Sequence, residues 1–292
     1  MFRRILLLLC VILGLQGVGL GAENASNSTP TELYALNIGK ADCIILCHGD
    51  SHYLVDTGWE TTSDALLDAL RALEITHLDG VFITHAHKDH TGGLEALLSS
   101  AVTVDAVYTA AYSQDRGAEH AGVVACARHG YPMQYLSAGD RVQGNDPDVY
   151  FDVLGPLRLN QDNENNNSLV LAFYTPNGCI LLTGDMKSEE EFELCRAGVI
   201  PDCDVLKVPF HGDNTACGDA LLKACSPRMA VISTSTKEES DTPSREVLRR
   251  LAGRGCECYV TQDCADALCI TLLDGKPTAQ NVTFLPSSES GE

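Results

Sequence analysis

The sequence predicts an α/β fold built of two β-sheets with helices on their outer faces. Short apolar runs typical of strands recur from Leu33 to Leu273, and segments with apolar residues at helical spacing lie between them. The pattern of strands followed by alternating helices and strands occurs in both halves of the chain. Two similar halves of this kind pack most economically as two sheets face to face, with their helices outside.

The N-terminal 22 residues are typical of a secretory signal peptide. Met1-Phe2-Arg3-Arg4 is basic, residues 5–20 are apolar, and small residues precede Glu23. A retained membrane anchor is the alternative, because the apolar run is near the lower length of a spanning helix. We therefore expect an exported protein, secreted or held at the cell surface. Beyond residues 1–22 we expect a polar linker at 23–30, a folded domain at 31–275 and a polar C-terminal tail at 276–292.

The charge balance argues against long nucleic acid as a partner. The net charge is −20, from 20 basic and 40 acidic residues. Proteins that bind a phosphate backbone need clustered Lys and Arg, and no such stripe is visible here. The composition favours a small substrate or a membrane headgroup. No later apolar run predicts a membrane channel, and nothing indicates an obligate protein partner.

Cysteine is abundant, with thirteen residues in the whole chain and twelve beyond Cys10. An even number in an exported chain is compatible with disulfides. Several of these cysteines lie in apolar segments, where a free cysteine serves as a small hydrophobic side chain. Cys43 and Cys47 are four residues apart in one expected strand, too far apart to bond each other. The sequence leaves the pairing open.

The first half of the chain begins with strands and then alternates. A helix after Asp56-Thr57-Gly58 places Leu66 and Leu70 on one face, and residues 118–129 form a second helix that ends at Gly130. The strands expected here are 33–38, 43–47, 52–55, 81–83 and 104–108.

The second half repeats this order. A glutamate-rich helix around residues 189–193 presents a solvated face, and Thr242-Pro243 is expected to cap a later helix. The strands expected here are 149–154, 168–174, 179–182, 204–210, 228–233, 258–261 and 267–273.

Three histidines and one carboxylate occur within six residues, at His85, His87, Asp89 and His90. The apolar run 81–83 precedes them, so the cluster lies on a strand-to-helix turn where side chains can converge. Neutral imidazole and carboxylate are ligands for zinc, iron and manganese. A solvated polar loop is the alternative, but it does not account for this spacing behind a buried strand.

Two later strands also end in residues that bind metals. Residues 181–184 lead into Asp185, and residues 204–210 lead into His211. Together with the first cluster, these side chains are enough to hold two divalent ions about 3.5–4 Å apart, bridged by a carboxylate. A water between two such ions loses a proton near neutral pH and becomes a nucleophile. No serine triad or phosphate-binding loop competes with this interpretation.

The combination of motifs resembles the metallo-β-lactamase superfamily, and within it the hydrolase domain of ComEC-type competence proteins and their stand-alone relatives. The resemblance covers roughly residues 33–273. It implies a four-layer αββα sandwich with two metal ions at the sheet edges, zinc first and manganese or iron as alternatives. The motifs that carry it are Asn37–Asp42, Asp56–Gly58, His85–His90, Asn166–Val170, Leu182–Asp185 and Asp204–Gly212.

The resemblance also implies a role for each residue. His85 and His87 would hold the first metal, and Asp185 would bridge the two ions. Asp56 would orient a ligating histidine, and Asp42 would either do the same or fix its turn. Asp89 and Asp185 would be the catalytic carboxylates. The second metal would be held by Asp89, His90 and His211.

The chain departs from the family pattern at four places. Lys40 and Ala41 replace two residues of the usual Gly-Gln-Gly-Asp turn, and Phe210 replaces the first histidine of His-His-Gly-Ser. The superfamily's usual histidine between the first cluster and the bridging acid is absent, and Asn166-Asn167-Ser168 stands there instead. Thr242-Pro243 lacks the histidine that often precedes this proline. The first metal site therefore lacks a usual ligand.

We predict a hydrolase of phosphoester or phosphodiester bonds that uses a metal-bridging hydroxide. A DNA nuclease of the ComEC type is one alternative, and a catalytically weak, metal-binding recognition module is another. The segments expected to contact substrate are the Asn166, Asn167 and Ser168 loop and the polar loop that contains Arg116.

Overall fold

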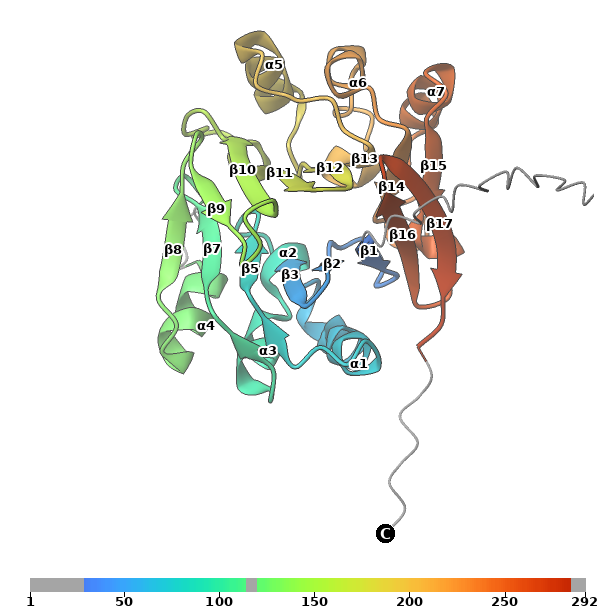
Figure 1. Ribbon diagram of the computed structural model, residues 1–292. Coiled ribbons are helices and arrows are strands. Elements are labelled where there is room, and N and C mark those ends of the chain that lie inside the picture. The colour runs from blue at the N-terminus through green and yellow to red at the C-terminus, as the bar shows by residue number, and fades with distance from the viewer. Residues whose placement is uncertain (1–28, 114–119, 285–292) are drawn as a thin grey trace, which may run out of the picture.

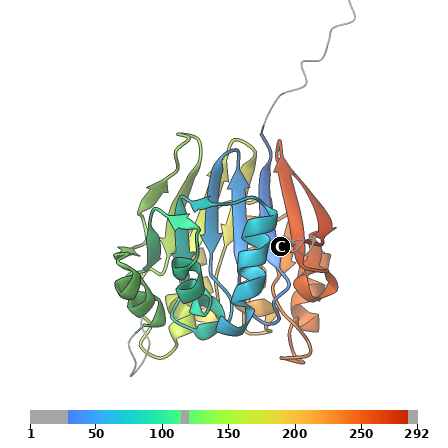
Figure 2. The ribbon, with the colours of Figure 1, turned by 90° about the horizontal axis from the view of Figure 1, so that it is seen from below.

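The computed structural model describes residues 29–113 and 120–284, which form four layers (Figure 1). Two sheets face each other in the middle. Helices α1, α3 and α4 cover the outer face of one sheet, and α5, α6 and α7 cover the other. From below, the helices of the first outer layer lie in front of the strands they cover (Figure 2). The predicted αββα sandwich is confirmed.

The first sheet contains eight strands in the order β17-β16-β1-β2-β3-β5-β7-β8. Pairing is antiparallel from β17 to β3 and parallel from β3 to β8. Its strands are β1 (Thr31–Leu36), β2 (Ile44–His48), β3 (Ser51–Val55), β5 (Gly80–Ile83), β7 (Val107–Ala110), β8 (Met133–Leu136), β16 (Ala267–Leu273) and β17 (Lys276–Val282).

The second sheet contains seven strands in the order β15-β14-β13-β12-β11-β10-β9. Its strands are β9 (Arg141–Gln143), β10 (Tyr150–Gly155), β11 (Val170–Thr175), β12 (Gly178–Leu182), β13 (Val205–Lys207), β14 (Met229–Ile232) and β15 (Glu257–Val260). Strands β12 to β15 are parallel, so their carboxyl ends lie at one edge. A separate pair joins β4 (His77–Leu78) to β6 (Thr103–Val104).

The helices alternate with the strands along the chain. The α-helices are α1 (Ser63–Ala72), α2 (Lys88–Thr91), α3 (Leu94–Ser99), α4 (Ala121–His129), α5 (Ser188–Ala197), α6 (Asp219–Cys225) and α7 (Arg245–Gly253). Short 3-10 turns occur at η1 (Glu60–Thr62), η2 (Glu164–Asn167), η3 (Pro209–Gly212) and η4 (Thr261–Asp263).

The core between the sheets is centred on three phenylalanines. Phe151 lies 4.4 Å, centroid to centroid, from both Phe82 of the first sheet and Phe173 of its own sheet. All three are fully buried. Aromatic pairs at this spacing stabilise a core by about 0.5–1.5 kcal/mol beyond the apolar area they bury. This contact fixes the sheets against each other, and with them the strand ends that carry the predicted ligands.

Several predicted boundaries were wrong. Lys276–Val282 was expected in a polar tail but forms β17, which pairs with β16 along its whole length. The domain therefore extends past residue 275. Strands β8 and β9 were not predicted, because each is short and largely exposed on at least one face. The strand expected at 104–108 instead splits into β6 and β7.

The late helix begins differently from the prediction. Ser244, rather than Thr242-Pro243, caps α7, because its side chain accepts a hydrogen bond from Val247 N at 3.2 Å.

All twelve cysteines in the described ranges are free, and most are buried. Within residues 29–113 and 120–284, no helix is long and apolar enough to cross a membrane. The predicted signal peptide and most of the linker lie outside the described residues.

Candidate metal centre

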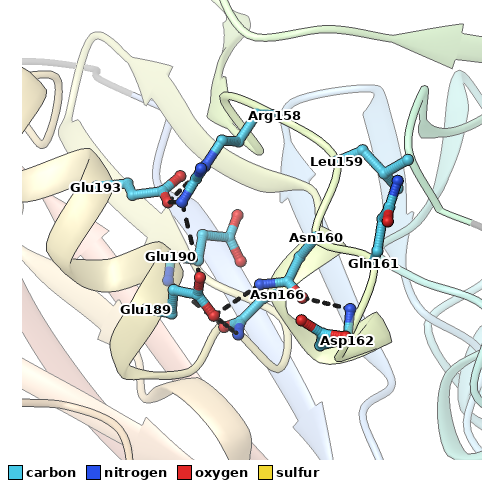
Figure 3. A pocket seen from close by; sticks show the side chains of 9 residues that line it. All are labelled: Arg158, Leu159, Asn160, Gln161, Asp162, Asn166, Glu189, Glu190 and Glu193. Atoms are coloured by element: carbon cyan, nitrogen blue, oxygen red, sulfur yellow. Dashed lines mark hydrogen bonds and ion pairs between the residues drawn. The ribbon is translucent and has the colours of Figure 1, made fainter.

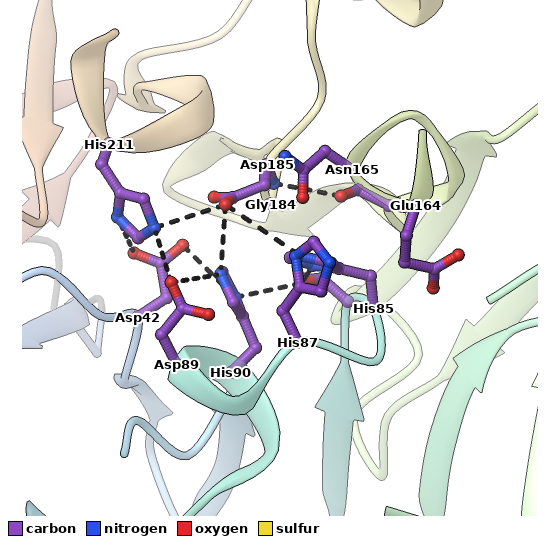
Figure 4. A network of polar contacts seen from close by, with 12 residues as sticks. Asp42, His85, His87, Asp89, His90, Glu164, Asn165, Gly184, Asp185 and His211 are labelled. Atoms are coloured by element: carbon purple, nitrogen blue, oxygen red, sulfur yellow. Dashed lines mark hydrogen bonds and ion pairs between the residues drawn. The ribbon is translucent and has the colours of Figure 1, made fainter. Parts of the chain in front are cut away.

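The predicted ligands come from both sheets and meet at one edge (Figure 4). The cluster from His85 to His90 follows β5 of the first sheet, and its last two members lie on α2. Asp185 follows β12 and His211 follows β13, which are parallel neighbours in the second sheet. Because the carboxyl ends of parallel strands share an edge, these side chains project toward one point.

Four side chains form the tightest part of the cluster. Asp185 Oδ2 lies 3.3 Å from His211 Nε2 and 3.4 Å from His90 Nε2. Asp89 Oδ2 lies 3.4 Å from His211 Nε2. One ligand atom from each of the four residues lies within 4.8 Å of all the others. We name this set, Asp89, His90, Asp185 and His211, the four-residue cluster.

Buried polar atoms in the cluster lack hydrogen-bond partners. His90 Nε2, His211 Nε2 and Asp185 Oδ1 are inaccessible to solvent and form no hydrogen bond. Leaving such groups unpaired costs free energy, and native proteins rarely tolerate it. A divalent ion would coordinate these atoms, and imidazole nitrogen with carboxylate oxygen is the donor set of zinc, manganese and iron. The residues therefore fit the metal ions that the sequence predicts.

His85 and His87 lie beside the four-residue cluster. His85 Nε2 is 4.0 Å from Asp185 Oδ2 and 3.0 Å from His87 Nδ1. His85 is fully buried, whereas His87 is exposed and lies at the solvent side. Asp185 thus stands between two sets of histidines, as a bridging ligand must. The structure brings all six predicted ligands together, and their roles in binding metal stay predictions.

Asp56 holds His90 in place. His90 Nδ1 donates to Asp56 Oδ2 at 2.7 Å, and Thr84 donates to the same carboxylate through its backbone N at 2.7 Å and its Oγ1 at 2.8 Å. This arrangement fixes the imidazole so that Nε2 faces the cluster. Asp56 has a φ of 58°, a strained backbone for a residue other than glycine. His211 is fixed similarly, since its Nδ1 donates to Ser233 O at 2.8 Å.

Asp42 was predicted either to orient a ligating histidine or to fix its turn, and the direct partner of its side chain is a lysine. Its carboxylate lies 3.8–3.9 Å from the Nδ1 atoms of His211 and His90, too far for a hydrogen bond. It forms a buried ion pair with Lys207, whose Nζ also donates to Gly184 O at 3.3 Å. Lys207 is only 1% exposed, and lysine is almost never buried without a partner.

Sequence reasoning missed Lys207 and Glu164. A single charge inside the apolar run from Val205 to Val208 was the available signal for the lysine. Glu164 Oε1 accepts from Ser113 Oγ at 2.8 Å and from Ala86 N at 3.3 Å, between two predicted ligands. Glu164 therefore supports the loop that carries His85 and His87.

The asparagine-rich loop supports the site from behind. Ser168 Oγ accepts from Asp185 N at 3.1 Å, and Asn166 Oδ1 accepts from Lys187 N at the same distance. Asn167 Nδ2 donates to Glu164 Oε2 at 2.9 Å. All three predicted side chains are buried and engaged with protein groups, so their contact with substrate stays a prediction. Arg116, the other predicted contact, lies outside the described residues.

The charges of the cluster shift its proton affinities. Burial alone would lower the pKa of His90, but the carboxylates of Asp185, Asp56 and Asp89 outweigh it and raise that pKa well above its usual range. The same opposition raises the pKa of His211 to about 9. Burial also opposes ionisation of Asp185, yet the two histidines hold its pKa well below the usual range. The Asp185 carboxylate is thus ionised, whereas a metal ion would have to displace protons from the His90 and His211 rings.

A second polar pocket lies between α5 and the loop before η2 (Figure 3). Arg158 forms an ion pair with Glu193 there and lies 3.7 Å from Glu189. Glu190 points into the same space, is only 2% exposed, and has no hydrogen-bond partner on either carboxylate oxygen. Burial raises the pKa of Glu190 well above its usual range and so favours the neutral form of this side chain.

Comparison with known proteins agrees with the fold. Residues 36–236 match the model of the metallo-beta-lactamase superfamily. ComE operon protein 3 of Bacillus subtilis is 28% identical over 242 residues, which cover 77% of this chain and 31% of that protein. Competence protein ComA of Neisseria gonorrhoeae is 26% identical over 246 residues, covering 84% and 33%. The chain spans about a third of the length of these relatives.

Two solved structures share the fold at 13% sequence identity. The metallo-beta-lactamase fold protein YhfI of Bacillus subtilis has a TM-score of 0.55, covering 84% of this chain and all of that one. CmlA, a diiron beta-hydroxylase of Streptomyces venezuelae, has a TM-score of 0.53, covering 84% and 54%. The second shows that this fold also supports chemistry other than hydrolysis. Because the family model covers most of its length, the chain belongs to the metallo-beta-lactamase superfamily.

Proposed function

We propose that this protein is an exported, metal-dependent hydrolase of phosphoester or phosphodiester bonds that works with two divalent ions. The position of Asp185 carries the proposal. Its Oδ2 atom lies within 3.3–4.0 Å of three histidines that belong to two sets, one on each side. Zinc suits this donor set, with manganese or iron as alternatives.

The side chains of the site have different roles in the proposed reaction. Divalent ions bound here would activate water and stabilise negative charge on the attacked group. Asp56 and the carbonyl of Ser233 keep Nε2 of His90 and His211 directed at the site. Within the four-residue cluster, Asp89 alone keeps access to solvent, at 16% side-chain exposure. Its carboxylate is therefore the member of the cluster that incoming water meets first.

A small ester is favoured over long DNA as the substrate. A net charge of −20 repels a polyanion, and attraction between a polyanion and basic residues supplies most of the affinity in DNA binding. DNA cleavage is the second candidate, because competence and recombination proteins are among the relatives. A recognition module without catalysis is the third, and the complete four-residue cluster argues against it.

Metal analysis combined with hydrolysis tests the proposal. We expect purified protein loaded with zinc or manganese to bind about two ions per chain and to cleave bis-p-nitrophenyl phosphate. Asp185→Ala should lose both the ions and the activity, while Asp202→Ala, an exposed carboxylate, should keep both. If the protein binds fewer than one ion per chain and hydrolyses nothing, both enzyme hypotheses are excluded and only the recognition module remains.

Two further measurements address substrate and location. Rapid digestion of single-stranded DNA that persists at moderate salt would favour the nuclease, because nonspecific DNA binding weakens steeply with salt. For export, the N-terminal sequence of protein recovered outside the cell should begin near residue 23. An N-terminus at Met1 on membrane-bound protein would indicate the retained anchor instead.

A further inference from the structure

Two lysines face one aromatic ring beside the candidate metal centre. Lys187 Nζ lies 4.6 Å and Lys40 Nζ 5.8 Å from the centroid of the Phe210 ring. Both distances are within the range of cation–π attraction. We name these three residues the lysine rim.

Each member of the lysine rim is next to a residue of the metal centre in the sequence. Lys40 precedes Asp42 by two positions, Lys187 follows Asp185 by two, and Phe210 precedes His211. The Phe210 and His211 rings are 6.5 Å apart, centroid to centroid. In Figure 4, Asp42 and His211 lie on the side of the centre away from His85 and His87, and Asp185 lies between. Three separate segments of the chain contribute the residues of the rim.

The backbone at each position is held in place. Phe210 has φ 47° and ψ 48°, a left-handed conformation that costs about 1–3 kcal/mol in a residue with a side chain and persists only when its surroundings enforce it. Its N donates to Gly184 O at 3.2 Å. Lys187 N donates to Asn166 Oδ1 at 3.1 Å, and Lys40 N donates to Glu238 Oε2 at 2.8 Å. The rim is a constrained feature of the fold.

The rim concentrates positive charge in a strongly acidic protein. Among the described residues, Lys187 has no carboxylate within ion-pair distance. Lys40 Nζ is 3.6 Å from Glu239 Oε2, a contact that is weak because the glutamate side chain is 46% exposed. All three rim side chains remain partly accessible to solvent. An anion that lies near both ammonium groups would be attracted by each of them.

We propose that the lysine rim binds a second anionic group of the substrate, next to the group that is cleaved. This proposal rests on the proposed function and narrows it. The same two ammonium groups would repel a choline cation and occupy the ring on which it would stack. The favoured substrates are therefore phosphoesters with a second phosphate. A nucleotide and an anionic lipid headgroup both present this chemistry.

Binding of two matched nucleotides tests the rim without catalysis. Titration calorimetry on zinc-loaded protein should show that thymidine 3′,5′-bisphosphate binds more tightly than thymidine 5′-monophosphate. The preference of the double variant Lys40→Ala/Lys187→Ala should be about tenfold smaller than that of wild type, which corresponds to about 1.4 kcal/mol. Lys223→Ala, an exposed lysine on α6, should keep it. A preference that is unchanged in the double variant would overturn the proposal.

Hydrolysis distinguishes the sources of the second phosphate. Thymidine 5′-(p-nitrophenyl phosphate) with and without a 3′-phosphate forms the nucleotide pair, and glycerophosphoinositol with and without a 4-phosphate forms the lipid pair. In wild type we expect the added phosphate to lower KM, and so to raise kcat/KM, in one of the two pairs. In the double variant the added phosphate should change neither value. Faster cleavage of glycerophosphocholine than of either phosphorylated ester would contradict the rim.

The two proposals fail in different ways. If no phosphoester is cleaved but the lysine-dependent binding preference remains, the proposed function is wrong and the rim is an anion site. If esters are cleaved and the double variant prefers the phosphorylated esters as strongly as wild type does, the proposed function stands and the proposed role of the rim is wrong. Zinc content measured on every variant shows whether a substitution has disturbed the metal centre itself.

Discussion

At the scale of single residues, the residues that hydrogen-bond to the candidate ligands are as important for metal binding as the ligands themselves. Asp56 receives three hydrogen bonds, one from His90 and two from Thr84. It occupies a strained left-handed conformation to reach them. Carboxylates in this position fix the ring and increase the basicity of the ligating nitrogen.

Asp56→Asn should weaken metal binding without removing a ligand. The amide presents an N–H where a carboxylate accepted one, so His90 loses its orientation. We expect the metal affinity to fall by about 10–100-fold, measured by competition with a chelating dye. Asp50→Asn, in the exposed turn between β2 and β3, is the matched control. Equal affinities in the two variants would mean that Asp56 does not orient His90.

The buried pair of Lys207 and Asp42 makes a separate prediction. Lys207→Met leaves the Asp42 carboxylate without its partner inside the protein, which costs about 3–5 kcal/mol. Urea unfolding of the metal-free proteins measures this loss. The double variant Lys207→Met/Asp42→Asn should recover much of it, because no unpaired charge remains. A double variant no more stable than the single one would show that the lysine acts through packing alone.

At the scale of elements, helix α5 carries a residue that lowers stability, directly after a segment that carries functional residues. Its N-terminus follows the segment that positions Asp185 and Lys187. One turn on, Glu190 is buried without a hydrogen-bond partner. A raised pKa of a buried carboxyl has no effect on stability below its unfolded pKa, and its cost grows as the pH rises from there to the folded pKa. Above that value the unfolded chain releases the proton while the folded chain still holds it, so stability falls as pH rises.

Glu190→Gln should therefore stabilise the protein in a pH-dependent way. The glutamine keeps the shape of the neutral acid and cannot ionise in the unfolded chain. We expect a gain on the order of 1 kcal/mol near neutral pH and little difference at about pH 4, from thermal unfolding. Glu189→Gln, on the exposed side of the same helix, serves as the control. A gain of equal size at both pH values would exclude the ionisation argument.

Strand β17 provides a test of the corrected boundary. It pairs with β16 in seven residue positions and protects the edge of the first sheet. Truncation after residue 275 should expose that edge, lower the melting temperature and promote aggregation. Truncation after residue 284 should leave both properties unchanged. If the two truncated proteins have the same melting temperature and the same tendency to aggregate, residues 276–282 do not contribute to the folded domain.

At the scale of the whole molecule, the candidate centre connects the two sheets. His85 to His90 belong to the first sheet, and Asp185 and His211 belong to the second. Anything bound among them holds the two halves together. It also binds the folded state more tightly than the unfolded chain, because the full ligand set spans 126 positions, from His85 to His211.

Metal should accordingly stabilise the whole protein. At a free ion concentration about 1,000 times the dissociation constant, linkage predicts about 4 kcal/mol of added stability. The melting temperature of zinc-loaded protein should exceed that of chelator-treated protein, and Asp185→Ala should abolish the difference. A similar increase in the variant would mean that the ion binds elsewhere.

The sequence alone determined the fold class and the six ligand candidates, because strand-to-helix turns after apolar runs and the spacing of His85, His87, Asp89 and His90 are local signals. Tertiary structure decided the rest. The Lys207–Asp42 pair, the support of Ala86 by Glu164 and the lysine rim each join residues from distant segments, and no local pattern records such contacts. Strand β17 depends in the same way on β16, since its polar sequence forms a strand only where a partner edge satisfies its backbone.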